Sequence, residues 1–118
     1  MENNRIAKLI QKREKCLKAL PPLEECIRGT VYKRRITCGK DYCHCATGRK
    51  HIIWHFSVTH PKGKTEQISL HRKQVPTVRG WVRNYKKAKK LLEAVSSINR
   101  DIIRLQRTQL KEDGKSNA

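Results

Sequence analysis

Apolar residues near the start of the chain recur at spacings of three and four, as they do on one face of an α-helix. The pattern covers residues 3–20 and comprises Ile6, Leu9, Ile10, Cys16, Leu17 and Leu20. Pro21 and Pro22 end it, because neither proline can donate a backbone hydrogen bond. We therefore predict an N-terminal amphipathic helix within residues 1–22.

The following segment has the alternating, β-branched pattern of strands. Residues 30–37, 52–59 and 66–70 fit this pattern, and Pro61-Lys62-Gly63-Lys64 is a turn between the last two. One face of the middle strand carries Ile52, Trp54, Phe56 and Val58. Three strands alone bury too little surface to be stable, so we expect a helix to pack on that face. The prediction for residues 27–72 is a three-stranded antiparallel sheet with a cysteine-rich loop, residues 38–49, joining strands 1 and 2.

A long second helix is predicted from residue 76 to residue 110. Pro76 suits a first helical turn, and the apolar stripe that follows comprises Val78, Trp81, Tyr85, Ala88, Leu91, Leu92, Val95, Ile98, Ile102 and Leu105. This stripe could pair with the first helix, or with a second chain, in which case Asn99 would fix the register. We expect residues 111–118 to form a polar, frayed tail. The fold class is α+β, in one domain overall.

Charge is distributed unevenly along the chain. The 118 residues contain 28 Lys and Arg against 10 Asp and Glu, a formal net charge of +18. Residues 27–90 hold 17 of the basic residues and only two acidic ones, whereas residues 1–26 and 91–118 are nearly neutral. A positive segment of this kind repels itself unless an anion neutralises it, and release of counterions favours binding to a phosphate backbone. The predicted partner is therefore a nucleic acid, RNA or DNA.

Other classes of protein do not fit the sequence. No apolar run approaches the ~18–20 residues that span a bilayer, so we expect no membrane association. The first residues, Met1-Glu2-Asn3-Asn4-Arg5, lead into an amphipathic pattern rather than a secretory signal. Five cysteines, an odd number, favour a reducing compartment over a disulfide framework. The expected location is the cytoplasm.

The cysteine-rich loop carries the most specific chemical pattern. It contains Cys38, Cys43 and Cys45, and His51 follows six residues after the last cysteine. A structural zinc ion takes four thiolate or imidazole ligands in a tetrahedron, and these residues supply four. We therefore predict a zinc ion bound by Cys38, Cys43, Cys45 and His51.

Alternatives to this ligand set remain open. His44 could replace His51 as the fourth ligand, although it lies between two cysteines that would share the site; His55 and Cys26 are weaker candidates. Without metal, the cysteines would be free thiols in a small core or a redox-labile trio. We favour metal, because a small domain with few aromatic residues in a reducing compartment gains stability from it.

This stretch also resembles an uncharacterised family of small bacterial and archaeal domains. The resemblance covers roughly residues 28–105 and is carried by Gly29-Thr30, Cys38-Gly39-Lys40, Cys43, Cys45-Ala46, Gly48, His51, Gly63-Lys64-Thr65 and Asn84-Tyr85. Members of that family usually continue with Gly-Pro-Tyr after the histidine, whereas this chain has Ile52-Ile53-Trp54, so we expect a different aromatic surface there. The family has no established activity, and the resemblance implies only the cysteine set and the order of elements.

Candidate nucleic-acid contacts follow from the basic residues and from one aromatic residue. Trp54 and Phe56 share an apolar face and are expected in the core, His55 is expected as a polar surface residue, and Tyr42 is the better candidate for stacking on bases. The predicted contacts are Lys33, Arg34, Arg35, Lys40, Tyr42, Arg49, Lys50, Lys62, Lys64, Arg72, Lys73, Arg79, Arg83, Lys86, Lys87 and Lys90.

We predict no enzymatic activity. Hydrolysis of phosphodiesters usually needs carboxylates to hold a metal or to accept a proton. Asp41 and Glu66 are the only carboxylates in the basic segment, and no histidine has a recognisable spacing with either. The function predicted is a small, zinc-stabilised, non-enzymatic nucleic-acid-binding protein, monomeric or dimeric through its long helix. The alternative is an assembly module that uses the long helix and binds an acidic protein.

Overall fold

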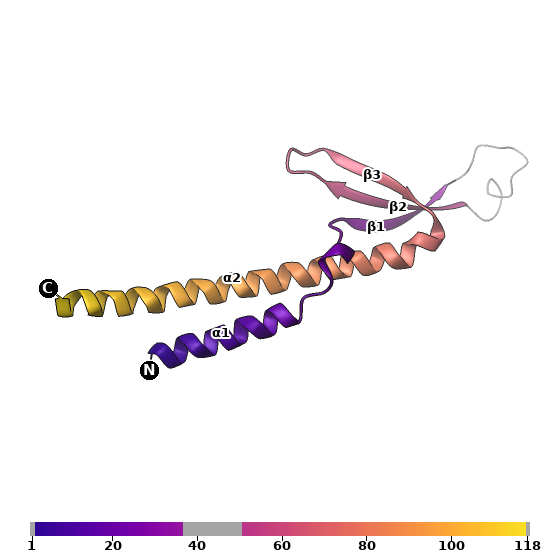
Figure 1. The fold of residues 1–118 in the computed structure, drawn as a ribbon. Coiled ribbons are helices and arrows are strands. Elements are labelled where there is room, and N and C mark those ends of the chain that lie inside the picture. The colour runs from indigo at the N-terminus through magenta and orange to yellow at the C-terminus, as the bar shows by residue number, and fades with distance from the viewer. Residues whose placement is uncertain (1, 37–50, 118) are drawn as a thin grey trace, which may run out of the picture. The chain divides into compact units, whose positions relative to one another are not determined.

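The computed structural model describes residues 2–36 and 51–117, with side chains described over residues 3–36 and 51–112. Its elements are α1 (Glu2–Lys18), the 3-10 turn η1 (Leu23–Glu25), β1 (Thr30–Ile36), β2 (His51–Thr59), β3 (Thr65–Leu70), the 3-10 turn η3 (Arg72–Gln74) and α2 (Val75–Asn117) (Figure 1). The predicted α+β class and the order of helix, three strands and long helix are confirmed.

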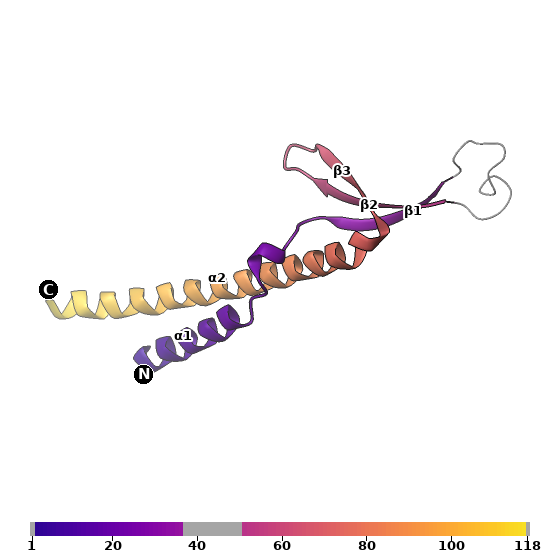
Figure 2. The same ribbon diagram turned by 45° about the vertical axis from the view of Figure 1, so that its right-hand side comes forward.

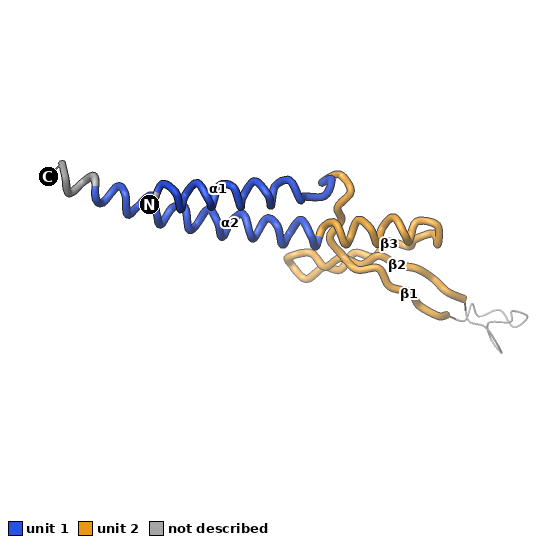
Figure 3. Tube along the Cα trace, turned by 90° about the horizontal axis from the view of Figure 1, so that it is seen from below, with its two compact units in different colours: residues 1–23, 86–118 blue, residues 24–85 orange. Residues whose placement is uncertain are grey.

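The chain forms two compact units. Unit 1 contains Met1–Leu23 and Lys86–Ala118, and unit 2 contains Glu24–Tyr85 (Figure 3). The long helix α2 therefore contributes its first residues to unit 2 and the remainder to unit 1. None of the described helices has a stretch both long enough and apolar enough to cross a membrane.

Unit 1 is an antiparallel pair of helices, α1 and the later part of α2 (Figure 3). Its buried side chains are Ile98 and Ile102 of α2. Polar contacts also join the helices: Arg13 Nη1 donates to Asn99 Oδ1 at 2.9 Å, and Gln109 Nε2 donates to Asn3 Oδ1 at 2.6 Å. The structure thus has the intrachain pairing of the two predicted helices, with Asn99 bonded to α1.

The stripe predicted on the long helix is only partly right. Ile98 and Ile102 of that stripe are buried, whereas Leu92, which was also expected to be buried, is 67% exposed. Each residue turns the helix by about 100°, so Leu92 lies about 100° around the helix axis from the midpoint of Ile98 and Ile102. The long helix was predicted to end at residue 110, whereas its backbone is helical through Asn117.

Unit 2 is built around a three-stranded antiparallel sheet in the order β1-β2-β3 (Figures 1 and 2). Val31 pairs with Phe56, and Phe56 pairs with Ile68. At the β2–β3 turn, Gly63 N donates to His60 O at 2.9 Å and His60 N donates to Lys64 O at 2.7 Å. Gly63 has a φ of 86°, which a glycine adopts without a steric cost, as the turn residues predict.

The first turns of α2 cover one face of this sheet. Phe56 is 3% exposed, and Val75 and Val78 are buried with it. On the same face, the Arg79 guanidinium lies 5.0 Å from the centre of the Trp54 ring, a cation–π contact. The expectation that a helix packs on the Trp54 face is confirmed.

Two further hydrogen bonds fix the segment before β1 to α2. Ile27 N donates to Trp81 O at 3.1 Å, and Asn84 Nδ2 donates to Glu25 O at 3.0 Å. The backbone of the incoming chain is therefore held on α2 before it enters the sheet.

Candidate nucleic-acid interface

The predicted contacts on β1 are Lys33, Arg34 and Arg35, and all three are exposed. Successive side chains of a strand point to opposite faces of the sheet. Lys33 pairs across the strands with Trp54 and so lies on the α2-facing side, as does Arg35, whereas Arg34 pairs with Ile53 on the opposite side. This edge of the sheet is therefore basic on both faces.

A second set of predicted contacts lies at the two ends of β3. Lys62 and Lys64 are exposed in the turn before β3, and Arg72 and Lys73 are exposed in η3 after it. The turn η3 is shaped by His71, whose Nδ1 accepts from Lys73 N at 3.1 Å while Gln74 Oε1 accepts from His71 N at 2.9 Å. This reciprocal cap holds the two basic side chains on one short turn.

The remaining predicted contacts are divided among several places. Arg79 and Arg83 are exposed on the part of α2 that belongs to unit 2, and Arg79 also contacts Trp54. Lys86, Lys87 and Lys90 are exposed on the part that belongs to unit 1. Four more predicted contacts, Lys40, Tyr42, Arg49 and Lys50, lie outside the described residues.

The positive charge of the interface has no carboxylate partner among the described residues. The ion pairs in that part of the chain are His60–Glu66 at 3.0 Å, Arg100–Glu93 at 3.1 Å and Arg104–Asp101 at 2.8 Å. Two of these lie on the later part of α2, and the third lies beside the β2–β3 turn. Arg28 donates instead to a main-chain oxygen, that of Thr59, at 2.9 Å. The exposed cations of β1, the turn and η3 therefore make no ion pair with a described carboxylate.

The aromatic residues separate as expected. Phe56 is buried, and Trp54 is half-buried beside Arg79, so both belong to the packed face. The sequence interpretation overlooked Tyr32, which stacks on His55 across the strands, with ring centroids 5.4 Å apart and planes 28° from parallel. The signal was present, because the alternation that places Trp54 on one face places Tyr32 and His55 on the other.

The predicted zinc site falls mostly on residues that the structure does not describe. Cys38, Cys43 and Cys45 lie there, as does the alternative ligand His44. His51 is described as the exposed first residue of β2, immediately after the cysteine loop. Within residues 2–36 and 51–117, no three His, Cys, Asp or Glu side chains gather as a metal site would require. The ligand set therefore stays a prediction from the sequence.

Comparison with known families adds one match. The family model for DUF6788, a domain of unknown function, matches residues 4–80, which is more than half of the chain. The chain belongs to the DUF6788 family. Neither the search of curated proteins nor the search of solved structures found a match.

The DUF6788 match confirms the resemblance to an uncharacterised family and changes its extent. The resemblance found in the sequence covers roughly residues 28–105, whereas the family model begins in α1 and ends within the first turns of α2. The whole described sheet lies inside the match, and so does Arg79. Arg83, Lys86, Lys87 and Lys90 lie beyond its end.

Three described histidines of this DUF6788 chain, His55, His60 and His71, contact neighbouring groups of unit 2. His55 stacks on Tyr32, His60 pairs with Glu66, and His71 caps η3. The His60–Glu66 ion pair is exposed, with its two side chains at 46% and 54%. Among the described residues, no two of these histidines are brought together with a carboxylate.

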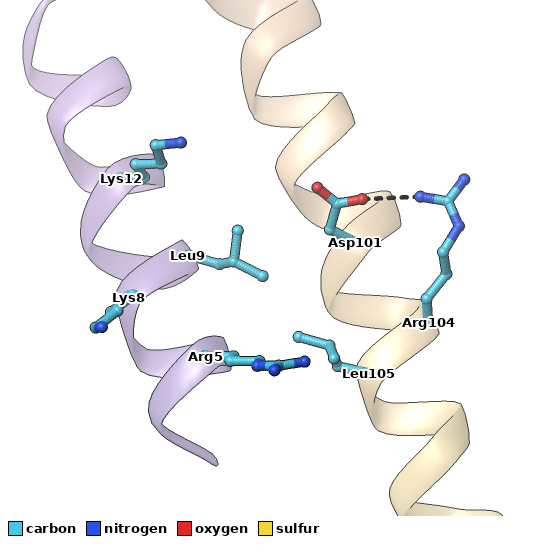
Figure 4. A pocket seen from close by; sticks show the side chains of 7 residues that line it. All are labelled: Arg5, Lys8, Leu9, Lys12, Asp101, Arg104 and Leu105. Atoms are coloured by element: carbon cyan, nitrogen blue, oxygen red, sulfur yellow. Dashed lines mark hydrogen bonds and ion pairs between the residues drawn. The ribbon is translucent and has the colours of Figure 1, made fainter. Parts of the chain in front are cut away.

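Unit 1 contains a hollow of about 600 Å³ between α1 and α2 (Figure 4). Leu9 and Leu105 point toward each other across it, and its other lining residues are Arg5, Lys8, Lys12, Asp101 and Arg104. Its one carboxylate, Asp101, is already paired with Arg104. The hollow lies between the packed helices and holds none of the predicted nucleic-acid contacts.

Proposed function

We propose that this DUF6788 protein is a small, non-enzymatic nucleic-acid-binding protein that contacts the phosphate backbone of RNA or DNA. The observation that carries the proposal is the set of exposed basic side chains on β1, the β2–β3 turn and η3. These side chains have no carboxylate partner among the described residues. Arginine can grip a phosphate through two parallel hydrogen bonds, and lysine adds a mobile positive charge.

Phosphate binding through such a surface has a characteristic response to salt. Each phosphate neutralised on a duplex releases counterions and adds about 0.9 to the slope of log K against log salt concentration. A surface that engages several phosphates at once therefore loses affinity steeply as salt rises. A partner recognised by apolar contacts would show a shallow response.

The test is fluorescence anisotropy with labelled duplex DNA, single-stranded DNA and structured RNA, each across a salt series. We expect binding at low salt to at least one of the three, with a steep decline as salt rises. The tightest of them would identify the class of nucleic acid. Absence of binding to all three at low salt would contradict the proposal.

A charge-matched pair of variants locates the surface. The test variant replaces Lys33, Arg34 and Arg35 with glutamine, and the control replaces Lys15, Lys18 and Arg107, three exposed cations of unit 1. Both lose three charges, so a purely global effect of net charge would weaken binding equally. We expect the β1 variant to lose more affinity and to flatten the salt slope by about 0.9 for each phosphate contact removed.

The zinc ion belongs to the same proposal. A metal bound by Cys38, Cys43, Cys45 and His51 would close the loop between β1 and β2 and would keep its thiolates reduced and ligated in a cytoplasmic setting. His51 supports this role by its place at the start of β2, where a strand leaves the loop. Lys40, Arg49 and Lys50, in the same loop, would then be held near the basic edge of β1.

An assembly module is the second candidate, and one observation favours it. Leu92, Ile103 and Leu110 of α2 are 67%, 63% and 69% exposed. They are 11 and 7 residues apart, close to whole numbers of helical turns, so they form one apolar stripe. Such a stripe would suit a second copy of α2 or another protein, including an acidic one drawn to the basic segment.

Light scattering over a concentration series separates the two candidates. Self-assembly through the stripe predicts a mass that rises with concentration and falls again when Leu92, Ile103 and Leu110 are changed to glutamine. A constant monomer mass would contradict self-assembly through the stripe. The nucleic-acid proposal predicts that the same triple variant keeps its affinity for the tightest of the three polymers.

A further inference from the structure

The sheet of unit 2 carries a row of side chains on the face opposite α2. Tyr32 of β1 pairs across the strands with His55 of β2, which pairs with Ser69 of β3. The Tyr32 and His55 rings are stacked, with centroids 5.4 Å apart and planes inclined by 28°. The row therefore begins with two flat rings and ends with a short side chain.

This face has no packed layer among the described residues. The buried side chains of unit 2, those of Phe56, Val75 and Val78, belong to the α2-facing side of the sheet or to α2 itself. On the opposite side, Tyr32 and His55 are only half-buried, and Gln67 and Ser69 are exposed. The two rings therefore keep part of their surface open to solvent.

The contact that orders the His55 ring is the stack itself. His55 Nδ1 is buried and has no hydrogen-bond partner within the described part of the chain. A buried polar atom without a partner costs free energy, so a ring held in this way needs another source of stability. Stacking on Tyr32 supplies it. The residue paired with His55 on its other side, in β3, is Ser69.

Ser69 is too short to cover that side of the ring. A third flat group could extend the stack there, or could lie on the outer side of Tyr32 at the sheet edge. Nucleobases are flat groups of the right kind, and aromatic side chains on an open sheet are a common platform for unpaired bases. A base in a duplex has both faces covered by its neighbours and cannot bind in this way.

The charge beside the row favours a nucleic acid over an uncharged flat ligand. Arg34 lies two residues along β1 from Tyr32, on the same face, which is about 7 Å along the strand. It is exposed and makes no ion pair with a described carboxylate. A base stacked on the row would thus have an arginine within reach of its neighbouring phosphate.

We propose that Tyr32 and His55 form a stacking platform for unpaired bases of a single-stranded nucleic acid, with Arg34 contacting the adjacent phosphate. This inference rests on the proposed function, because it names the part of the polymer that the basic surface would present to the sheet. It adds a preference for single strands that phosphate contacts alone would not produce.

The experiment compares three labelled probes of equal length and charge: a pyrimidine 12-mer of DNA, the same 12-mer of RNA, and an abasic 12-mer that keeps the phosphates and lacks the bases. Four proteins are titrated with each probe: the unchanged chain, Tyr32→Leu, Tyr32→Phe and Gln67→Leu. Tyr32→Phe keeps the ring. Gln67→Leu is the matched control, since it adds the same leucine at an exposed position of the same face.

We expect Tyr32→Leu to weaken binding of a base-containing probe about tenfold, in line with the loss of one stacked base. Its affinity for the abasic probe should stay within twofold of the unchanged chain. Tyr32→Phe and Gln67→Leu should bind all probes within about twofold of the unchanged chain. The DNA and RNA arms show whether the 2′-hydroxyl matters to the platform.

Two results would overturn the platform while leaving the proposed function intact: equal affinity of the unchanged chain for abasic and base-containing probes, or unchanged binding by Tyr32→Leu. Failure of the unchanged chain to bind any of these single-stranded probes at low salt would also overturn the platform. The proposed function would fall with it only if duplex DNA and structured RNA are not bound either. If Tyr32→Leu does not fold, Tyr32→Trp decides the matter. Its added tryptophan fluorescence should be quenched by the base-containing probes and not by the abasic one, and equal responses would refute the platform.

Discussion

Gly29, immediately before β1, occupies a position that only glycine tolerates. Its φ of 154° is one that residues with a side chain rarely adopt. A Cβ atom added there would collide with the Phe56 ring and would lie 2.7 Å from the main-chain oxygen of Ser57. Because Phe56 is 3% exposed, it has no free space into which to move. The core of unit 2 therefore requires this close approach of the Gly29 backbone to β2.

Gly29→Ala should lower the free energy of unfolding by about 3 kcal/mol, the combined cost of backbone strain and overpacking. Gly63→Ala is the matched control, since Gly63 also has a positive φ, of 86°, but has nothing within 4 Å of an added Cβ. Its loss should be about 1 kcal/mol, from strain alone. Chemical denaturation followed by circular dichroism measures both, and equal losses would show that the contact with Phe56 is unimportant.

At the scale of elements, the strands were more predictable than the faces of the long helix. Alternation in residues 52–59 specifies which side chains share a face, and the Pro61–Gly63 turn specifies how β2 meets β3, so the sheet follows from local pattern. A long helix with many apolar residues contains several overlapping stripes. Only the partner helix decides which one is buried, and here α1 selects Ile98 and Ile102 and leaves Leu92 exposed.

The hydrogen bond between Arg13 and Asn99 also favours this pairing of α1 with α2. It joins α1 to α2 at 2.9 Å in a partly buried position. Arg13→Leu, Asn99→Leu and the double variant form a thermodynamic cycle, and we expect a coupling energy of about 1–2 kcal/mol in the unfolding free energy, typical of a hydrogen bond to a charged group. A coupling near zero would mean that this hydrogen bond adds nothing to the pairing of α1 with α2.

A second prediction at this scale concerns the segment before β1. Asn84→Ala removes the donor that holds Glu25 O at 3.0 Å. The expected loss is about 1 kcal/mol of unfolding free energy, the usual net worth of one such bond. Asn99 and Arg13 lie in the other compact unit, so this loss should add to theirs without coupling. Thermal or urea unfolding of the single and combined variants measures it, and strong non-additivity would contradict the separation of the two effects.

For the whole molecule, the charge of the candidate site could be predicted from the sequence, because the distribution of Lys and Arg along the chain places the basic segment at residues 27–90. The position of each cation on a particular face required the register of β1 with β2. The Tyr32–His55 stack was missed because stacking depends on ring orientation, which spacing does not specify. The cysteine loop lies outside the described residues, and its chemistry still rests on sequence.

The zinc prediction has a direct test at this scale. Protein purified under reducing conditions should contain about one equivalent of zinc by mass spectrometry. Cys43→Ser should lose the metal and lower thermal stability, because binding of a structural zinc is coupled to folding. Cys16→Ser is the matched control, since Cys16 is half-buried on α1 and belongs to no predicted ligand set. Protein purified without zinc would contradict the site, and metal-free protein that unfolds at the same temperature as the metal-loaded form would contradict its structural role.

The basic run on β1 also opposes edge-to-edge pairing between copies of this chain. The sheet has the order β1-β2-β3, so β1 is an outer strand with one hydrogen-bonded neighbour in the described sheet. Outer strands invite pairing with other chains, and lysine and arginine on them oppose it. Two β1 edges brought together would set three positive charges against three. A polyanion that neutralises those charges removes this protection. Turbidity should therefore appear when chains are crowded onto a limiting amount of negative polymer, and it should decline when excess polymer spreads the chains apart.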